Sequence, residues 1–253
     1  MDAAGNLYGT TLGDGSNTWG TVFQLEKNGK FNLLYTFSGG ADGGSPGASL
    51  LLDSLGNLYG TTAYGGDLKC NPPDGCGTVF EVNTKHKESV LHAFDLKEGI
   101  YPSAPVIMDA SGNLYSTTLA GGNSACGGGA EGCGTIFELR RDKSGWNLVV
   151  LHIFTGRRDG GRPYASGVLR DARGNLYGTA SQGGKLSCAG GIGCGTIFEL
   201  NSAGKLIVLY SFIGSASGAS PNAGLLRNAK GIFYGTASEG GGDSYGTVWK
   251  LTP

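Results

Sequence analysis

The sequence predicts an all-β protein of the β-propeller class, and three observations lead to that prediction. First, one motif occurs five times at intervals of about 50 to 60 residues, as GNLYGT at Gly5, Gly56 and Gly174, GNLYST at Gly112 and GIFYGT at Gly231. Second, a GTVF-like motif follows every copy and begins at Gly20, Gly77, Gly134, Gly195 and Gly246. Third, 49 of the 253 residues are glycine and 15% are charged, which suits tight turns and short strands better than amphipathic helices.

Each repeat is expected to form four short strands, and the second copy shows them most clearly. Residues 48–53 form a mostly apolar run, residues 57–62 are rich in Tyr and Thr, residues 78–82 alternate, and residues 89–94 form a fourth β-like run. The turn between the first two runs contains Asp, Gly and Asn, which accept turn geometry. An antiparallel meander of about 50 residues has the size of one propeller blade.

With the four strands named a to d, the chain reads bcd, then abcd three times, then abc. We therefore expect a single propeller domain over residues 1–253, with five four-stranded blades of which the first and last are incomplete. Four blades plus a closing hairpin is the alternative. An open array would expose apolar faces at both ends, so ring closure or further sequence has to cover them. The approximate repeats are 1–44, 45–100, 101–161, 162–218 and 219–253.

The repeat cores resemble the GloVer type of bacterial tandem repeat over nearly the whole chain. The matching features are GNLYGT, GTVF or GTIF, and the glycine pairs at Gly65, Gly121 and Gly183. This resemblance implies a propeller-like fold in a secreted or surface-attached protein, and it brings no established activity. The Asp-x-x-Gly-Asn-Leu-Tyr turn is also similar to that of NHL-type propeller repeats, which supports strand a as the innermost strand.

Six cysteines form three pairs, and each pair lies in a loop between strands b and c. Loops with a pair are about six residues longer than the two loops without one, so each insertion carries its own pair. We expect a local disulfide in each loop, which stabilises the fold by about 2 kcal/mol and indicates an oxidising compartment. Free thiols and zinc are the alternatives, but the pairs lie on separate repeats and their loops contain no histidine. The pairs are Cys70/Cys76, Cys126/Cys133 and Cys188/Cys194.

Charge and hydropathy exclude several classes of partner. The formal net charge is −1 and 19 residues are Lys or Arg, so no basic stripe supports nucleic-acid binding. The longest apolar stretch, residues 146–154, is too short to span a bilayer. Residues 1–9 lack the features of a signal peptide, so we expect any export signal to lie upstream or to have been removed.

The variable loops connect strands b and c and strands d and a at one end of each sheet, and we expect the functional surface there. Aromatic faces stack on the C–H surfaces of a sugar while polar groups bind its hydroxyls. Each loop residue can instead simply shape a turn or cover a blade edge. The candidate ligand-binding residues are Trp19, Asp42, Tyr64, Tyr101, Arg158, Asp159, Arg162, Tyr164 and Tyr245.

The sequence argues against catalysis, because the predicted inner strands contain no carboxylate and a glycosidase needs two. Such a pair would have to come from loop residues such as Asp42, Asp159 or Asp243. His92 and His152 occupy a strand-d position that other repeats fill with Tyr, which indicates packing.

One strand-c position holds Glu81, Glu138 or Glu199 in three repeats but Gln or Lys in the others, which indicates a blade surface rather than a metal site. No cofactor motif is present, and we predict neither a cofactor nor a metal.

These patterns predict a secreted, non-catalytic protein, extracellular or at the cell surface, that binds carbohydrate or another extracellular polymer or acts as an adhesion module. One alternative is an extracellular polysaccharide hydrolase or lyase that uses loop carboxylates. The other is a self-assembling structural protein whose incomplete end blades pair between copies to form a homo-oligomer.

Overall fold

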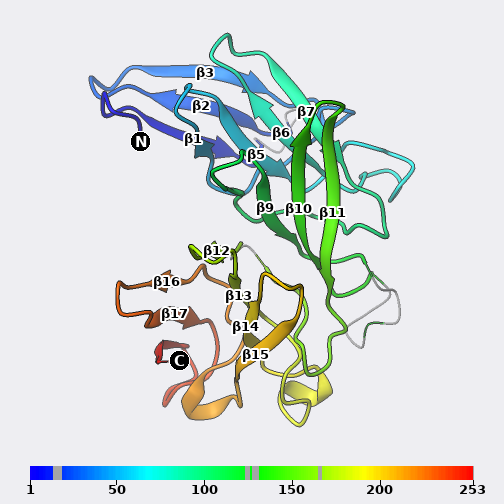
Figure 1. Cartoon of the computed structure of the whole chain (residues 1–253), viewed down its shortest axis with the longest axis vertical. Helices are drawn as coiled ribbons and strands as arrows, with labels where there is room; N and C mark the ends of the chain where they lie inside the picture. Colours follow the sequence, from blue (N-terminus) through cyan, green and yellow to red (C-terminus); the bar gives the residue numbers. More distant parts are fainter. Residues whose placement is uncertain (14–18, 123–125, 127–130, 165–166, 253) are drawn as a thin grey trace. The chain divides into compact units, whose positions relative to one another are not determined.

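The computed structural model describes residues 1–13, 19–122, 126, 131–164 and 167–252, which form five antiparallel sheets (Figure 1). In chain order these sheets hold three, four, four, four and three strands, which matches the predicted reading of bcd, abcd three times, and abc. The helices among the described residues are two short 3₁₀ turns, η1 (Ala189–Gly191) and η2 (Ser215–Ser217). The all-β prediction is confirmed.

The chain divides into two compact units, one of Met1–Leu114 with Leu139–Val149 and one of Tyr115–Glu138 with Val150–Pro253. The predicted single domain and its repeat boundaries stay predictions. In the first unit one sheet consists of β1 (Leu7–Thr11), β2 (Thr21–Leu25) and β3 (Phe31–Thr36), and the next of β4 (Leu51–Leu52), β5 (Leu58–Thr62), β6 (Thr78–Val82) and β7 (Glu88–Ala93).

In the second unit one sheet consists of β12 (Leu169–Arg170), β13 (Leu176–Ala180), β14 (Thr196–Leu200) and β15 (Leu206–Ser211). The last sheet consists of β16 (Leu226–Arg227), β17 (Phe233–Ala237) and β18 (Thr247–Leu251). The remaining sheet consists of β8 (Ile107–Met108), β9 (Leu114–Thr118), β10 (Thr135–Asp142) and β11 (Gly145–Ile153).

The Asp-x-x-Gly-Asn-x-Tyr motif forms a closed turn before strand b. Asp53 Oδ1 accepts the backbone N–H of Asn57 at 2.8 Å, while Oδ2 accepts the Asn57 amide at 2.9 Å and the Tyr59 hydroxyl at 3.3 Å. Burial tends to raise the pKa of Asp53, but these hydrogen bonds outweigh it and hold the pKa below its usual range. The motif therefore recurs because one carboxylate organises the whole turn.

The threonines at the end of strand b link neighbouring strands. Thr62 Oγ1 lies 2.8 Å from Thr78 Oγ1 across the b–c pair, and Thr61 Oγ1 donates to the Ala104 carbonyl at 3.0 Å, next to the following strand a. The second bond recurs from Thr10 to Ala48 and from Thr179 to Ala223.

The core lies between successive sheets. In the first unit the phenylalanine after strand d, Phe37, packs against Phe80 of the next strand c with ring centroids 5.0 Å apart. In the second unit Phe212 packs against Trp249 at 5.8 Å, and both belong to a cluster with Ile197. Aromatic pairs in this geometry add about 1 kcal/mol to the free energy of burial.

Three details differ from the sequence expectations. Strand a is only two residues long, because Leu51 and Leu52 alone pair with strand b, while the upstream Ala48 carbonyl accepts the Thr10 hydroxyl instead. The β10–β11 hairpin is longer than the other c–d hairpins, so length variation is not confined to one end of the sheets. Glu138 is buried rather than at a surface, and it accepts the Tyr115 hydroxyl at 2.9 Å.

Candidate functional site

Three of the predicted ligand-binding residues meet on the loops of the first unit. The ring centroids of Trp19 and Tyr64 lie 6.2 Å apart, and those of Tyr64 and Tyr101 lie 5.5 Å apart, both in edge-to-face geometry. Trp19 is 39% exposed, and the two tyrosines are half-buried. We call Trp19, Tyr64 and Tyr101 the aromatic row.

Glycines in the d–a loop hold the indole of Trp19. A Cβ atom at Gly44 would lie 3.0 Å from the indole ring, and one at Gly39 would collide with it. The Trp19 carbonyl accepts the Ser45 N–H at 2.6 Å, which ties the b–c loop that carries Trp19 to this d–a loop. The ring therefore rests on backbone that only glycine leaves open.

Tyr64 is fixed through its backbone. Its N–H donates to the Gly44 carbonyl at 3.1 Å, and its carbonyl accepts the Gly44 N–H at 2.9 Å. This isolated antiparallel bridge joins the b–c loop to the d–a loop beneath Trp19. The contact between the two rings thus follows from a backbone pairing that the sequence alone does not reveal.

Tyr101 has an unusual backbone, with φ of 57° directly before Pro102. Residues before proline prefer extended geometry, and left-handed geometry is uncommon outside glycine. The Tyr101 N–H donates to the Cys76 carbonyl at 3.2 Å, and Pro102 packs so closely on Gly77 that no Cβ would fit there. The surrounding structure therefore imposes this conformation.

Asn71, which the sequence analysis did not single out, completes the row. Its side-chain amide donates to the Tyr101 hydroxyl at 2.8 Å. Asn71 follows Cys70, and the Cys70–Cys76 disulfide closes the loop that carries it. Its place inside a disulfide-bonded insertion is the signal that could have identified it.

The second unit repeats the backbone geometry with polar side chains. Left-handed residues before proline recur at Arg162 and Ser220, with φ of 51° and 54°. The Arg162 guanidinium lies 3.6 Å from the Glu131 carboxylate, and Ser220 donates its hydroxyl to Glu239 at 3.1 Å. Ser45, before Pro46 in the first unit, shares this geometry with φ of 54°. Of these four positions, Tyr101 carries an aromatic ring and the other three carry polar side chains.

Asp42 and Asp159 are engaged within their own loops. Asp42 accepts the Tyr35 hydroxyl at 3.0 Å and the Ser38 N–H at 2.8 Å, and it also contacts the Ser38 hydroxyl. Asp159 accepts the backbone N–H of Thr155 at 3.0 Å, contacts its hydroxyl, and lies 3.2 Å from His152 Nε2.

Burial tends to raise the pKa of Asp159, but hydrogen bonds from His152 and Thr155 outweigh it and lower the pKa below the ordinary value. In the equivalent loop of the preceding repeat, Glu98 Oε2 lies 2.8 Å from His92 Nε2. These carboxylates stabilise turns, and the histidines also pack edge-on against Phe94 and Phe154 as the sequence indicated.

The remaining candidates lie on loops of the second unit. Arg158 is exposed, Tyr164 is 47% exposed and Tyr245 is 93% exposed. Tyr245 precedes Gly246 as Trp19 precedes Gly20, so the two residues occupy the same position in the repeat. Asp243 is exposed as well.

The three predicted disulfides are confirmed as Cys70–Cys76, Cys126–Cys133 and Cys188–Cys194. Within the described residues, no group of three or more His, Cys, Asp or Glu side chains is arranged to hold a metal ion. The helices in this part of the chain are all too short to cross a membrane.

Solved structures resemble the chain at low identity. A luciferin-regenerating enzyme matches with a TM-score of 0.55 and 14% identity, over 95% of this chain and 75% of the other. A Bacteroides uniformis protein with a provisional 6-phosphogluconolactonase assignment matches with a TM-score of 0.52 and 13% identity, over 98% and 66%. These likenesses confirm a propeller-like fold, while the number of blades and ring closure stay predictions.

No curated protein sequence matches the chain. A family model does match, once over residues 1–128 and once over residues 124–253. The two matches follow one another and together cover the whole chain. This agrees with the repeat motifs read from the sequence. The chain belongs to the Gloeobacter/Verrucomicrobia repeat family.

Proposed function

We propose that this chain is an extracellular, non-catalytic protein that binds carbohydrate or another extracellular polymer through the aromatic row. The observation that carries the proposal is the contact between Trp19, Tyr64 and Tyr101, three partly exposed rings on loops of a rigid β scaffold. Isolated exposed aromatics need no explanation, but rings gathered on variable loops are typical of binding surfaces.

The chemistry around the row suits a polyhydroxylated ligand. Aromatic faces pack against the C–H surfaces of a pyranose, and amide and phenol groups beside them exchange hydrogen bonds with hydroxyls. Asn71 and Tyr101 already share one such bond, so both polar groups are oriented at the end of the row. Preorganised side chains lose little entropy on binding, which favours affinity.

Two further observations support an extracellular role without catalysis. Three disulfides are typical of oxidising compartments. Asp42 and Asp159, two of the three loop carboxylates named for the hydrolase alternative, are occupied by hydrogen bonds within their own loops. Enzymes share this fold, but at identities that carry no inference about activity.

A glycan array followed by calorimetry against soluble polysaccharides tests the proposal. For a glycan that binds, Trp19→Ala and Tyr64→Ala should each weaken binding about tenfold or more, because each removes one stacking surface. Tyr245→Ala is the matched control, since it removes an exposed aromatic from the same repeat position as Trp19 and should leave affinity unchanged.

Absence of binding to every glycan and polysaccharide would refute the proposal. Equal losses in all three variants would also contradict it. Release of reducing ends from a polysaccharide, abolished by Asp243→Asn, would replace the proposal with the hydrolase alternative.

A further inference from the structure

The d–a loop that follows β11 carries three arginines, in the sequence Thr155-Gly-Arg-Arg-Asp-Gly-Gly-Arg162. The aligned loops at residues 38–45 and 213–220 have the same length and contain no Lys or Arg. Arg162 lies beside a carboxylate, whereas Arg157 and Arg158 are exposed, and in the described part of the chain neither of these two lies within ion-pair distance of a carboxylate. Both positive charges are therefore available to a ligand.

Arg157 and Arg158 line an open cavity of about 420 Å³, where their loop meets the next b–c loop. A volume of this order accommodates a small ligand or one unit of a polymer. The Asp159 carboxylate also lines the cavity, but it accepts the Thr155 N–H within its own turn. Leu186 adds an apolar surface from the b–c loop and is 40% exposed. The cavity thus combines two guanidinium groups with one apolar side chain, and we call Arg157 and Arg158 the arginine pair.

The backbone of this loop does not depend on the arginine side chains. The Arg157 carbonyl accepts the Gly184 N–H at 2.7 Å, which ties the d–a loop to the b–c loop. In the first repeat the Gly40 carbonyl accepts the Gly66 N–H at 3.0 Å in the same way, although Gly40 has no side chain. The arginines therefore add charge to a turn that forms without them.

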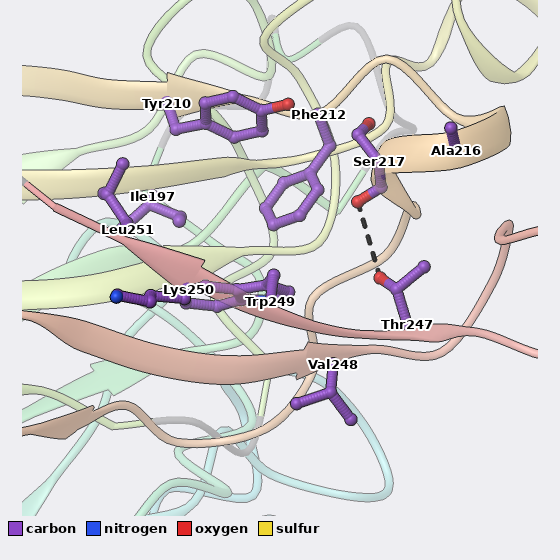
Figure 2. A pocket seen from close by; sticks show the side chains of 10 residues that line it. All are labelled: Ile197, Tyr210, Phe212, Ala216, Ser217, Thr247, Val248, Trp249, Lys250 and Leu251. Atoms are coloured by element: carbon purple, nitrogen blue, oxygen red, sulfur yellow. Dashed lines mark hydrogen bonds between the residues drawn. The ribbon is translucent and has the colours of Figure 1, made fainter.

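The next repeat forms the same turn with short side chains. There η2 (Ser215–Ser217) takes the place of residues 157–159, and Figure 2 shows Ala216 and Ser217 beside one another on it. The Ser217 hydroxyl accepts the Ile213 N–H at 3.0 Å and so closes the turn in place of the carboxylate. Substitution of the arginine pair by Ser and Ala is therefore compatible with the fold.

The unit that carries the arginine pair has an excess of positive charge. It contains ten Lys or Arg and seven Asp or Glu residues, a formal charge of +3, whereas the other unit contains nine and thirteen, a formal charge of −4. A net charge of −1 for the whole chain conceals this difference. A positive surface raises the local concentration of anions and speeds their association.

We propose that the arginine pair binds the anionic groups of an acidic polysaccharide, either the carboxylate of a uronate or a sulfate ester. The choice of a polysaccharide rests on the proposed function, and the choice of an anion rests on the arginines themselves. A guanidinium presents paired N–H donors that match the oxygens of either group. Leu186 packs against the C–H surface of the sugar ring that carries the group.

Calorimetry on the Trp19→Ala chain tests this site separately from the aromatic row. The probes are an oligogalacturonate, a sulfated oligogalactan and a neutral oligogalactan of the same length, at about 0.15 M salt, where long-range attraction is screened. At least one acidic oligomer should bind at least tenfold more tightly than the neutral one. The oligomer that binds identifies the recognised group as carboxylate or sulfate.

Arg157→Ser combined with Arg158→Ala should weaken this binding at least tenfold, because both guanidinium groups are lost. The matched control combines Arg173→Ser with Lys230→Ser, which removes two charges from exposed a–b turns of the same unit, at a position that the third repeat fills with Ser111. The control should change the affinity less than twofold. Urea unfolding of both double variants should match that of the parent chain.

Three results would overturn the proposal: equal binding of acidic and neutral oligomers, unchanged affinity in the arginine variant, or equal losses in the arginine variant and the control. Acidic oligomers that bind the original chain but not the Trp19→Ala chain would also overturn it, and would leave the proposed function intact. Glycan binding that always requires the arginine pair and never Trp19 would support this site and contradict the aromatic row.

Discussion

Glu88 is a source of instability that a single substitution should remove. It opens strand β7 opposite Val82, at the ladder position that other sheets fill with Phe31 and Leu206. Its Oε1 atom is buried without a hydrogen-bond partner. Burial, reinforced by the negative charge of Asp42, raises the pKa of Glu88 from 4.5 to about 7.

The size and sign of the effect follow from that pKa. Below pH 4.5 the carboxyl is protonated in both the folded and the unfolded chain, so ionisation costs nothing. Between pH 4.5 and about 7 the folded chain holds the proton more tightly, and stability falls as pH rises. A shift of this size corresponds to about 3 kcal/mol, and partial contact with water reduces the expected cost to about 2 kcal/mol.

Glu88→Gln removes the charge and keeps the shape. Urea unfolding at pH 8 should give a free energy of unfolding about 2 kcal/mol above that of the original chain, and at pH 4 the two should agree within about 0.5 kcal/mol. Asp74→Asn, at an exposed carboxylate of the same unit, controls for the change in net charge. A gain that is equal at pH 4 and pH 8, or no gain at pH 8, would refute the reasoning.

Two further predictions concern the loops. Asp159→Asn should lower the free energy of unfolding by about 1 to 2 kcal/mol at pH 7, because Thr155 and His152 lose a charged acceptor. Since the pKa of Asp159 in the folded chain lies below 3.8, the difference in free energy of unfolding between the two chains, measured with urea, should shrink as the pH falls below 3.8. A difference that stays constant with pH would contradict this prediction. Replacing Cys70 and Cys76 by Ser should lower the free energy of unfolding by about 2 kcal/mol. It should also weaken any glycan binding, because the loop no longer holds Asn71 against the Tyr101 hydroxyl. The same change at Cys188 and Cys194 should lower the free energy of unfolding by a similar amount and leave binding intact. Calorimetry that shows equal binding losses in the two pairs would contradict the proposed role of the Asn71 loop.

Local patterns predicted the strands well. The GT motif placed strand c of the second repeat at residues 78–82, as observed, because alternation and β-branched residues specify a strand locally. The cysteine pairs were predictable for a similar reason, since the partners are six or seven positions apart in the sequence.

The length of strand a was overestimated, because a hydrogen bond to the neighbouring sheet decides at which residue strand a begins to pair with strand b. The Ala48 carbonyl bonds a threonine side chain 38 residues away in the sequence. No pattern within one repeat reports such a partner.

The candidate site was predictable in residue type but not in arrangement. Aromatic and acidic residues on variable loops suggested a surface, yet the acidic ones serve their own turns through Tyr35 and His152. The aromatic row depends on the Gly44–Tyr64 bridge and on the left-handed Tyr101, both of which arise from contacts between successive repeats. Only three-dimensional structure brings these positions together.

The most direct test of the aromatic row is an NMR titration of the tryptophan indole N–H signals. The chain has three tryptophans, Trp19, Trp146 and Trp249, so three resolved signals can be assigned by single Trp→Phe variants. Addition of a polysaccharide fragment that binds on the array should shift the Trp19 signal and leave the other two unchanged. Binding that shifts Trp146 or Trp249 and leaves Trp19 unmoved would contradict carbohydrate recognition by the aromatic row.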